Sequence, residues 1–382
     1  MSRARPSIQS IAVIGAGIIG LSCALELADR GLTVSLYDKN VPPRGASWAA
    51  AGMLAPAFEA AVEPGTHPRL FELCDTSARM WPDWAQRLET ETGQSSGFVA
   101  GPSLAIARSP EQATFLESVR KRLSDHSQAP TACLPRLSEI EPAATPDACA
   151  ALLLPSDGHA DNRATLDALM IRAQAHPNMM LRHGEAALRM NSGALDHAGH
   201  DATLIAAGWQ SGQVQVDRGG ETVTLAMLDP IFDQITAFGG QMLAVAPVAN
   251  GPRLILRCGH VYIVPKADRI IIGATTEPGR AITKTEPDAI ADLHRQAAEI
   301  CPALADARVL ESWAGIRPGT RDHAPILGKT NVSNLFVATG HYRNGILLAP
   351  ITAKIMADLI ADGQRTDLAA AFAPAARFAE QL

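Results

Sequence analysis

Three glycines near the start of the chain have the spacing of a phosphate-binding turn. Gly15, Gly17 and Gly20 follow the short apolar run Ile11–Ile14 in a G-x-G-x-x-G pattern. In such a turn the first glycine permits the tight bend, the second lets the backbone approach a pyrophosphate, and the third allows close helix–strand packing. Asp38 stands eighteen residues after Gly20, where a carboxylate can accept hydrogen bonds from ribose hydroxyls. The pattern therefore predicts a bound dinucleotide.

A run of small residues soon after Asp38 bears on which dinucleotide is bound. Gly45–Met53 reads Gly-Ala-Ser-Trp-Ala-Ala-Ala-Gly-Met, and such a run lets the backbone and Ser47 press against a bulky planar group or its diphosphate. An ordinary NAD domain would continue here into another helix and strand. Thr203–Gly208 is a second apolar run that ends in glycine, which suits another close approach to the same ligand. These features favour a flavin dinucleotide. The alternative for Gly45–Met53 is that the segment is only a closely packed alanine-rich helix.

The sequence around the glycine-rich turn also predicts the strands and the helix that hold it. Ile11–Ile14 is a run of buried-strand type, Ile18–Arg30 has helical periodicity, and Thr33–Asp38 alternates as a second strand. Gly31 stands where a helix C-cap belongs. A β-α-β unit of this kind opens a doubly wound α/β sheet.

The hydrophobic pattern of the remaining chain predicts further helices and strands. The expected helices span 66–92, 111–123, 163–175, 287–300 and 346–360, the last with Pro350 in its first turn. The expected strands span 98–107, 241–245, 254–256, 262–264, 270–272 and 335–339. The stretch 129–146 is rich in prolines and small residues and is expected to be loop.

The order of these elements predicts two domains. An α/β start, a β-rich middle and an α/β finish indicate a nucleotide-binding domain built from separated segments, with an antiparallel-sheet α+β substrate domain inserted. We expect the first domain to comprise residues 1–90, 147–213 and 308–382, and the second to comprise residues 91–146 and 214–307. Ligands of such proteins bind where the two parts meet.

Composition narrows the class of protein. The 382 residues are 47% hydrophobic and 19% charged, which is typical of a folded globular chain of one large or two ordinary domains. A formal net charge of −6 and 4% aromatic residues disfavour nucleic acid as a partner. The six cysteines show neither C-x-x-C spacing nor a zinc pattern with histidine, so we expect no metal and reduced thiols in a cytoplasmic protein. Residues 11–27 are apolar but contain three glycines and Glu26, which argues against a signal peptide or membrane span.

On these residues and later ones the chain resembles the D-amino-acid oxidase superfamily, and most closely the glycine oxidases of the thiamine pathway. One block of similarity is Ile11–Glu59, which includes Ala46–Pro56 (Ala-Ser-Trp-Ala-Ala-Ala-Gly-Met-Leu-Ala-Pro). The other is Val261–Ile360, which includes Trp313–Thr320 (Trp-Ala-Gly-Ile-Arg-Pro-Gly-Thr) and Gly340–Pro350 (Gly-His-Tyr-Arg-Asn-Gly-Ile-Leu-Leu-Ala-Pro). These two blocks are specific to the family, whereas the glycine triplet alone is not.

The resemblance implies a Rossmann-like FAD-binding domain of the GR2 type, with the flavin ring facing the substrate domain. Gly340–Pro350 contains no cysteine of the kind that attaches flavin in some relatives, so we expect non-covalent FAD. Two positions depart from the family pattern. Thr276 stands where some glycine oxidases have methionine, which would change the size or polarity of the pocket. Phe372–Phe378 is alanine-rich where relatives tend to have prolines and charges.

The resemblance also implies roles for individual residues. Arg317 is expected to clamp the substrate carboxylate with its planar fork, and Tyr262 to support that carboxylate or close the pocket. Arg343 is expected beside the flavin, with Met53 and Thr276 lining the substrate pocket. The alternative is that the two arginines are surface or ion-paired residues and the tyrosine a half-buried strand residue. The expected cofactor-binding residues are Gly15, Gly17, Gly20, Asp38, Lys39, Ser47, Ala50, Gly52, Met53, Gly208, Trp209, Arg343, Asn344, Gly345, Ile346 and Leu347.

A helix that starts near Gly345 is expected to turn the positive end of its dipole toward the pyrimidine edge of the flavin. There it would stabilise the negative charge that the ring acquires on reduction. The resemblance, and not the spacing of the residues, is the basis of this expectation.

The implied function is FAD-dependent oxidative deamination of a small amino acid, with glycine expected to give glyoxylate, ammonia and hydrogen peroxide. Molecular oxygen would be the second substrate, and the imine would serve thiazole synthesis in the thiamine pathway. The alternatives are oxidation of sarcosine, D-alanine or D-proline, a D-amino-acid dehydrogenase that passes electrons to quinone, and a nucleotide-binding module without catalysis. We expect a homo-oligomer without stable membrane insertion.

Overall fold

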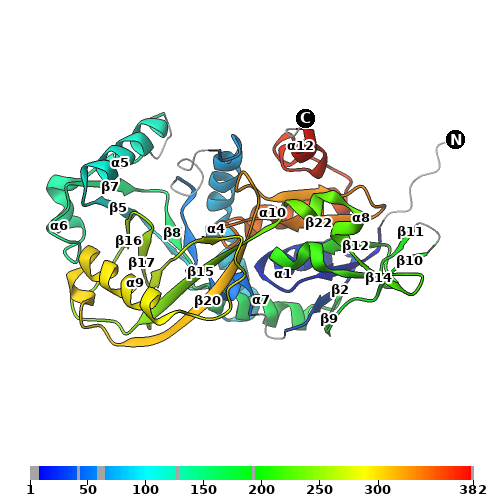
Figure 1. The fold of residues 1–382 in the computed structure, drawn as a ribbon. Helices are drawn as coiled ribbons and strands as arrows, with labels where there is room; N and C mark the ends of the chain where they lie inside the picture. The colour runs from blue at the N-terminus through cyan, green and yellow to red at the C-terminus, as the bar shows by residue number, and fades with distance from the viewer. Residues whose placement is uncertain (1–7, 41–43, 58–64, 126–128, 192–193, 380–382) are drawn as a thin grey trace.

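The chain folds into two lobes, each built on one large sheet (Figure 1). The computed structural model describes residues 8–40, 44–57, 65–125, 129–191 and 194–379. Within these residues, every helix falls short of the length or the hydropathy that a membrane crossing requires.

The first lobe is a six-stranded sheet covered by helices. In sheet order its strands are β21 (Ile326–Lys329), β22 (Leu335–Thr339), β12 (Ala202–Ile205), β1 (Ser10–Ile14), β2 (Thr33–Asp38) and β9 (Met179–His183). All of these pairings are parallel except the one between β21 and β22. Helices α1 (Ile18–Asp29), α4 (Leu70–Thr92), α7 (Asn162–Ala175) and α10 (Ala349–Ile360) share its main apolar core. The sheet joins segments from both ends of the chain, so the predicted nucleotide-binding fold made of separated segments is confirmed.

The second lobe is a nine-stranded and largely antiparallel sheet. Its order is β19 (Glu277–Pro278), β15 (Thr236–Val245), β18 (Ile270–Gly273), β17 (Val261–Pro265), β16 (Ile255–Cys258), β5 (Ser103–Ala107), β7 (Ala150–Leu154) and β6 (Thr131–Ala132), and β20 (Val309–Gly319) also pairs with β15. Helix α9 (Pro287–Ile300) packs its apolar side on one face of this sheet. Helix α5 (Pro110–Arg122) packs on β5 and β7.

Smaller elements complete both lobes. One minor sheet has the order β11 (Ala194–Asp196), β10 (Leu188–Asn191), β13 (Gln215–Arg218) and β14 (Glu221–Thr224), and the other has the order β3 (Met53–Leu54), β8 (Gly158–His159) and β4 (Val99–Ala100). The short α-helices are α2 (Ala46–Ala49), α6 (Leu137–Ile140), α8 (Leu225–Leu228), α11 (Asp367–Ala371) and α12 (Pro374–Ala379). The 3₁₀ turns are η1 (Leu134–Arg136), η2 (Gly208–Gln213), η3 (Pro230–Gln234) and η4 (Pro302–Leu304).

Three expectations about elements need correction. The expected strand 98–107 is divided into β4 and β5 by Gly101 and Pro102, because proline has no N–H for a sheet ladder. The expected loop 129–146 contains β6, η1 and α6. The long strand β20 was missed because its glycines and proline obscure the alternation of apolar and polar residues.

Strand pairing also bears on the domain boundaries. Strands β7 and β20 were expected in the nucleotide-binding domain, yet both pair within the nine-stranded sheet. Conversely, β13, β14 and η3 were expected in the substrate domain, yet their apolar residues pack against β1, β12 and β22. We therefore propose that β7 and β20 belong to the substrate domain. Residues 214–235 would belong to the nucleotide-binding domain.

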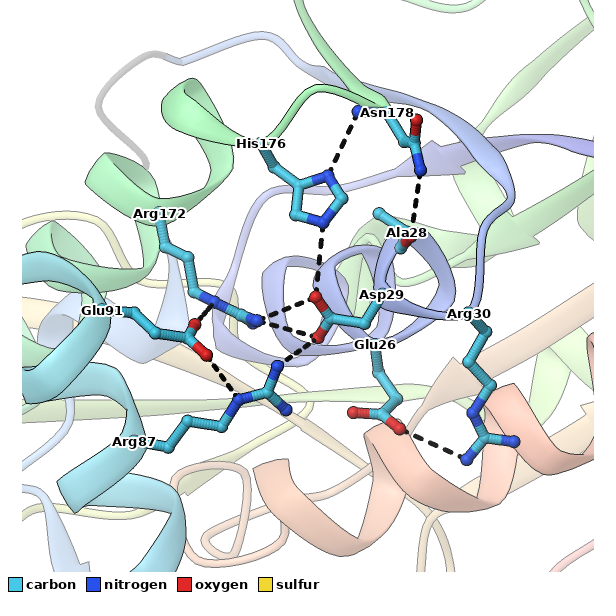
Figure 2. Close-up of polar contacts among 9 residues, drawn as sticks. All are labelled: Glu26, Ala28, Asp29, Arg30, Arg87, Glu91, Arg172, His176 and Asn178. Atoms are coloured by element: carbon cyan, nitrogen blue, oxygen red, sulfur yellow. Dashed lines mark hydrogen bonds and ion pairs between the residues drawn. The ribbon is translucent and has the colours of Figure 1, made fainter.

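A cluster of ion pairs joins α1, α4 and α7 on the outer side of the first lobe (Figure 2). The Asp29 carboxylate accepts hydrogen bonds from Arg172 at 2.8 Å and from Arg87 at 2.9 Å, and His176 Nε2 lies 3.3 Å from it. Glu91 accepts hydrogen bonds from both arginines. Burial alone would raise the Asp29 pKa, but the hydrogen bonds and charges of Arg172 and Arg87 outweigh it and hold the pKa below its usual value.

We predict that Asp29→Asn lowers the free energy of unfolding by about 2 kcal/mol at neutral pH, because two partly buried guanidinium groups lose one of their two negatively charged partners. A carboxylate whose pKa is lowered by folding stabilises the native state above its unfolded pKa of about 3.9, and this contribution is lost as pH falls through the folded pKa. The difference between variant and wild type should therefore vanish under acid conditions. Urea unfolding at several pH values measures it. The exposed pair of Arg136 and Glu139 provides the control Glu139→Gln, for which we expect no measurable change.

Candidate functional site

A cavity of about 900 Å³ extends from the β1–α1 turn to the face of the nine-stranded sheet. Most of the residues expected from the sequence line it: Gly15, Gly17, Asp38, Lys39, Ser47, Ala50, Gly52, Met53, Gly208, Trp209, Tyr262, Thr276, Arg317, Arg343, Gly345 and Ile346. The fold therefore joins the candidate nucleotide site and the candidate substrate site in one cavity.

The β1–α1 turn requires glycine at two of its three positions. Gly15 has φ +107°, and its N–H donates to the Tyr37 carbonyl at 2.8 Å. A Cβ on Gly15 would lie 2.5 Å from the Ala206 carbonyl oxygen, and one on Gly20 would lie 1.8 Å from the Gly15 oxygen. Helix α1 can thus begin directly against the turn, where its free N–H groups favour phosphate.

Asp38 ends β2 beside this turn. Its Oδ2 accepts from the Ala16 N–H at 2.7 Å, and its Oδ1 accepts from the Asn40 N–H at 2.8 Å. These bonds fix a carboxylate at the cavity wall, where ribose hydroxyls can donate to its remaining lone pairs. The neighbouring Lys39 is largely exposed and pairs with Glu185 at 2.5 Å.

The small-residue segment after Asp38 forms a wall of the cavity. Ser47 Oγ accepts from the Ile18 N–H at 3.0 Å, which ties this wall to the first turn of α1. Asn162, at the start of α7, donates its side-chain amide to the carbonyls of Ser47 and Trp48 at 2.9 and 2.8 Å. Asn162 was not identified from the sequence because its partners lie more than a hundred residues away.

Trp313 from the second lobe and Ala160 from the end of β8 hold the same wall. Trp313 Nε1, on β20, donates to the Ala49 carbonyl at 2.9 Å. Ala160 N–H donates to the Gly52 carbonyl at 2.9 Å, and a Cβ on Gly52 would lie 2.0 Å from the Ala160 oxygen. The alternative of an alanine-rich helix is therefore wrong for most of this segment, since α2 covers four residues and β3 follows.

Tyr262 lies flat on the face of the nine-stranded sheet. It pairs with Gly273 of β18, which pairs in turn with Met242 of β15, so all three residues share one face. A Cβ on Gly273 would lie 2.5 Å from Tyr262 Oη, and that oxygen lies 3.7 Å from Met242 Sδ. The glycine leaves the space that the phenol occupies.

Arg317 lies on the same face and approaches from β20. Its guanidinium covers Gly240, where a Cβ would lie 2.4 Å from Nη1. Nη1 donates to the carbonyls of Gly239 and Thr275, each at 3.3 Å. Among the described residues no carboxylate forms an ion pair with Arg317. A partly buried guanidinium that is oriented by carbonyl groups and not neutralised by an acid is suited to bind a carboxylate.

Arg343 reaches the cavity from the turn after β22. Its Nη2 donates to Thr276 Oγ1 at 3.3 Å, and its guanidinium lies 5.0 Å from the ring centroid of Tyr342. Thr276 thus presents a hydroxyl that accepts a hydrogen bond from an arginine. The pocket wall here is polar.

Three expected site residues lie behind the lining. Gly20 packs against the β1–α1 turn, and Asn344 is 3% exposed. Leu347 is buried, and its carbonyl accepts from Ser77 Oγ at 2.6 Å and from Trp81 Nε1 at 2.9 Å. These residues shape the wall without reaching its surface.

The expected helix near Gly345 begins later than predicted. Helix α10 starts at Ala349, with Pro350 in its first turn, and residues 345–348 form turns. Proline suits the first helical positions because those N–H groups have no partner within the helix. The cavity wall is therefore formed by the turn residues Gly345 and Ile346 and not by the first residues of the helix.

His341 is a lining residue that sequence reasoning missed. Its side chain is 2% exposed, and its Nε2 lies 3.1 Å from Thr352 Oγ1. Burial lowers the pKa of this imidazole to about 3, so the ring is neutral at physiological pH. The Gly-His-Tyr-Arg-Asn-Gly sequence at 340–345 was the available signal.

The comparisons with known proteins agree with this geometry. The model of the FAD-dependent oxidoreductase family matches residues 10–359. The chain belongs to this family. The predicted superfamily and FAD as its cofactor are thereby confirmed.

Relatives of the family resemble the chain over nearly its whole length. It is 33% identical to the "Bifunctional protein ThiO/ThiG" of Trichormus variabilis over 94% of the chain. It is 30% identical to the "Glycine oxidase" of Geobacillus kaustophilus, and the match covers 92% of each of the two sequences. The chain spans about half the length (53%) of the first of these. The crystal structure of glycine oxidase from Geobacillus kaustophilus superimposes with a TM-score of 0.82, 29% identity and coverage of 94% and 95% of the two chains.

The cavity fits the FAD of this family. The cradle at Gly15 and Gly20 is closed to any Cβ, as a turn in contact with phosphate requires. The carboxylate of Asp38 faces the same cavity. None of the six cysteines lines it, which supports non-covalent binding. Within the described residues no cluster of histidine, cysteine and acidic side chains could hold a metal ion.

We predict that Gly20→Ala greatly reduces FAD retention, because the new methyl group would overlap the Gly15 carbonyl and displace the turn. The ratio of flavin absorbance to protein absorbance after purification measures the effect. Gly101→Ala is the matched control, since a Cβ there meets nothing within 4 Å. Full flavin content in Gly20→Ala would contradict the assigned role of the turn.

Proposed function

We propose that this chain is an FAD-dependent amino-acid oxidase with glycine as its preferred substrate, producing glyoxylate, ammonia and hydrogen peroxide. The observation that carries the proposal is the Arg317 guanidinium, which is free of ion pairs within the described residues and lines the same cavity as the nucleotide cradle. The relatives named glycine oxidase support the choice of substrate.

The cofactor is proposed to be held along one wall of the cavity. Gly15, Gly17 and the start of α1 would hold the diphosphate, and Asp38 the ribose. Ser47, Ala50, Gly52 and Met53 would line the flavin with Gly208 and Trp209 and with the turn at Gly345 and Ile346. Bound FAD supplies the two-electron acceptor that amino acids need for oxidation.

The substrate is proposed to bind by its carboxylate. Arg317 would donate two parallel hydrogen bonds, and the hydroxyl of Tyr262 would add a third. Because glycine has only one carbon beyond its carboxylate, fixing the carboxylate also fixes the position of the reacting α-carbon. Arg343, held by Thr276, would stand beside the flavin and close the pocket.

The free amine of the substrate must be neutral for oxidation. Desolvation in the pocket disfavours an ammonium group, and the charge of Arg343 does so as well. Both effects lower the amine pKa and so raise the fraction of neutral amine at physiological pH.

Other substrates and acceptors of the same superfamily are the rival proposals. Sarcosine, D-alanine and D-proline carry the same carboxylate and would use the same arginine. A dehydrogenase that passes electrons to quinone would differ by releasing no peroxide in air. Cytoplasmic location, a homo-oligomeric state and transfer of the imine to thiazole synthesis stay predictions.

We expect glycine to bleach the flavin fastest when holoenzyme is mixed anaerobically with glycine, sarcosine, D-alanine and D-proline in turn. Stopped-flow absorbance of the oxidised flavin measures the rates. If another amino acid of the panel bleaches the flavin faster, glycine is not the preferred substrate. Admission of air should then restore the colour with one peroxide per turnover, and absence of peroxide would favour the quinone-linked dehydrogenase.

We expect Arg317→Ala to retain FAD but to raise KM for glycine about 100-fold, because loss of a charge-assisted carboxylate contact costs about 3 kcal/mol. Steady-state oxygen consumption measures the change. Arg308→Ala is the control, since Arg308 is exposed just before β20 and does not line the cavity. Equal kinetics for the two variants would remove Arg317 from its assigned role.

A further inference from the structure

Gln241 directs its hydrogen bonds to one segment, Thr275–Glu286. The residue lies in β15 and is 1% exposed. Its backbone N–H donates to Thr275 Oγ1 at 2.9 Å, and its carbonyl accepts from the Thr275 N–H at 3.3 Å. Its side-chain Nε2 donates to Glu277 Oε1 at 3.0 Å, and its Oε1 accepts from the Glu286 N–H at 2.6 Å. Gln241 thus fastens both ends of this segment to the sheet.

The fastened segment carries one acceptor of each pocket arginine. The Thr275 carbonyl accepts from Arg317 Nη1, and Thr276 Oγ1 accepts from Arg343 Nη2, each at 3.3 Å. These arginines come from different elements, one from β20 and one from the turn after β22. Adjacent residues of one segment therefore orient both of them.

Gln241 itself does not line the cavity, whereas its neighbours Gly240 and Met242 do. Side chains alternate between the two faces of a strand, so the Gln241 amide lies on the face opposite the pocket. The amide can act on the pocket only through the segment that it holds. Its partner Glu277 links it to Thr275, because Glu277 Oε1 also accepts from Thr275 Oγ1 at 3.3 Å.

We propose that Gln241 is a positioning residue that fixes the Thr275 carbonyl and thereby aims the Arg317 guanidinium at the substrate carboxylate. This inference rests on the proposed function, in which Arg317 binds that carboxylate. It adds that the affinity for the carboxylate is set by an amide on the far side of the sheet.

The two partners of the Gln241 side chain are matched by an amide. Glu277 needs a donor, and the Glu286 N–H needs an acceptor; one glutamine side chain supplies both. Leucine would supply neither, and glutamate would place a second carboxylate beside Glu277. Arg280 pairs with Glu277 and lies 3.6 Å from Glu286, and Lys284 lies in the same segment.

The test compares Gln241→Leu and Gln241→Glu with wild type as FAD-bound holoenzymes. The probe is glycolate, in which a hydroxyl replaces the amine of glycine, and its binding is measured by the change in the visible flavin spectrum. We expect Gln241→Leu to weaken glycolate binding at least tenfold at every pH. We expect Gln241→Glu to weaken it similarly at pH 8 and to recover as pH falls, because a proton shared with Glu277 restores the missing donor.

Ser103→Ala controls for loss of stability alone. Ser103 is buried in β5 of the same sheet, and its Oγ donates to Asp157 at 2.5 Å without lining the cavity. This variant should have a lower Tm and unchanged glycolate affinity. If Gln241→Leu does not fold, the pH dependence of Gln241→Glu decides the question alone.

Two results overturn different parts of the argument. Glycolate binding that is lost in Arg317→Ala but kept at every pH in the Gln241 variants overturns the positioning role and leaves the proposed function intact. Glycolate binding by wild type that Arg317→Ala does not weaken overturns the carboxylate clamp, and the inference falls with it.

Discussion

The site depends on Arg317 lying across a sheet surface that has no side chain beneath it. A Cβ at Gly240 would occupy the space of the guanidinium, and one at Gly273 would occupy the space of the Tyr262 phenol. Two missing methyl groups thus let two long side chains lie against the backbone of the sheet. Carbonyl groups then orient the guanidinium without neutralising its charge, which leaves that charge effective toward an anion in the cavity.

The cavity wall at residues 45–53 follows the same physical rule. Its carbonyls are held by Asn162 from α7 and by Trp313 from β20, and its Ser47 hydroxyl is held by α1. Each of these bonds engages backbone or a short side chain, so bulky groups are kept off the cavity surface. The two lobes are joined at this wall, because its partners come from both. The wall therefore connects the β1–α1 turn to the face of the nine-stranded sheet.

The amino-acid sequence predicted what depends on neighbours in the chain. The β1–α1 turn, Asp38, the helix 287–300 and the strand 335–339 follow from glycine spacing and hydrophobic periodicity within about twenty residues. The family motifs also identified Arg317, Tyr262 and Arg343, which the fold brings into one cavity. Local patterns failed where a strand is stabilised by a distant partner, as β20 is by β15.

The sequence by itself determined the nucleotide-binding turn, the residue types at the pocket and the α/β character of the chain. Tertiary structure alone decided that Gly240 and Gly273 lie under Arg317 and Tyr262, that Asn162 holds the wall, and that Gln241 bonds to the segment Thr275–Glu286. The reason is that a missing Cβ or a buried amide matters only through what packs against it. Some of those neighbours are more than a hundred residues apart in the sequence, and only the packing of strands and helices brings them together.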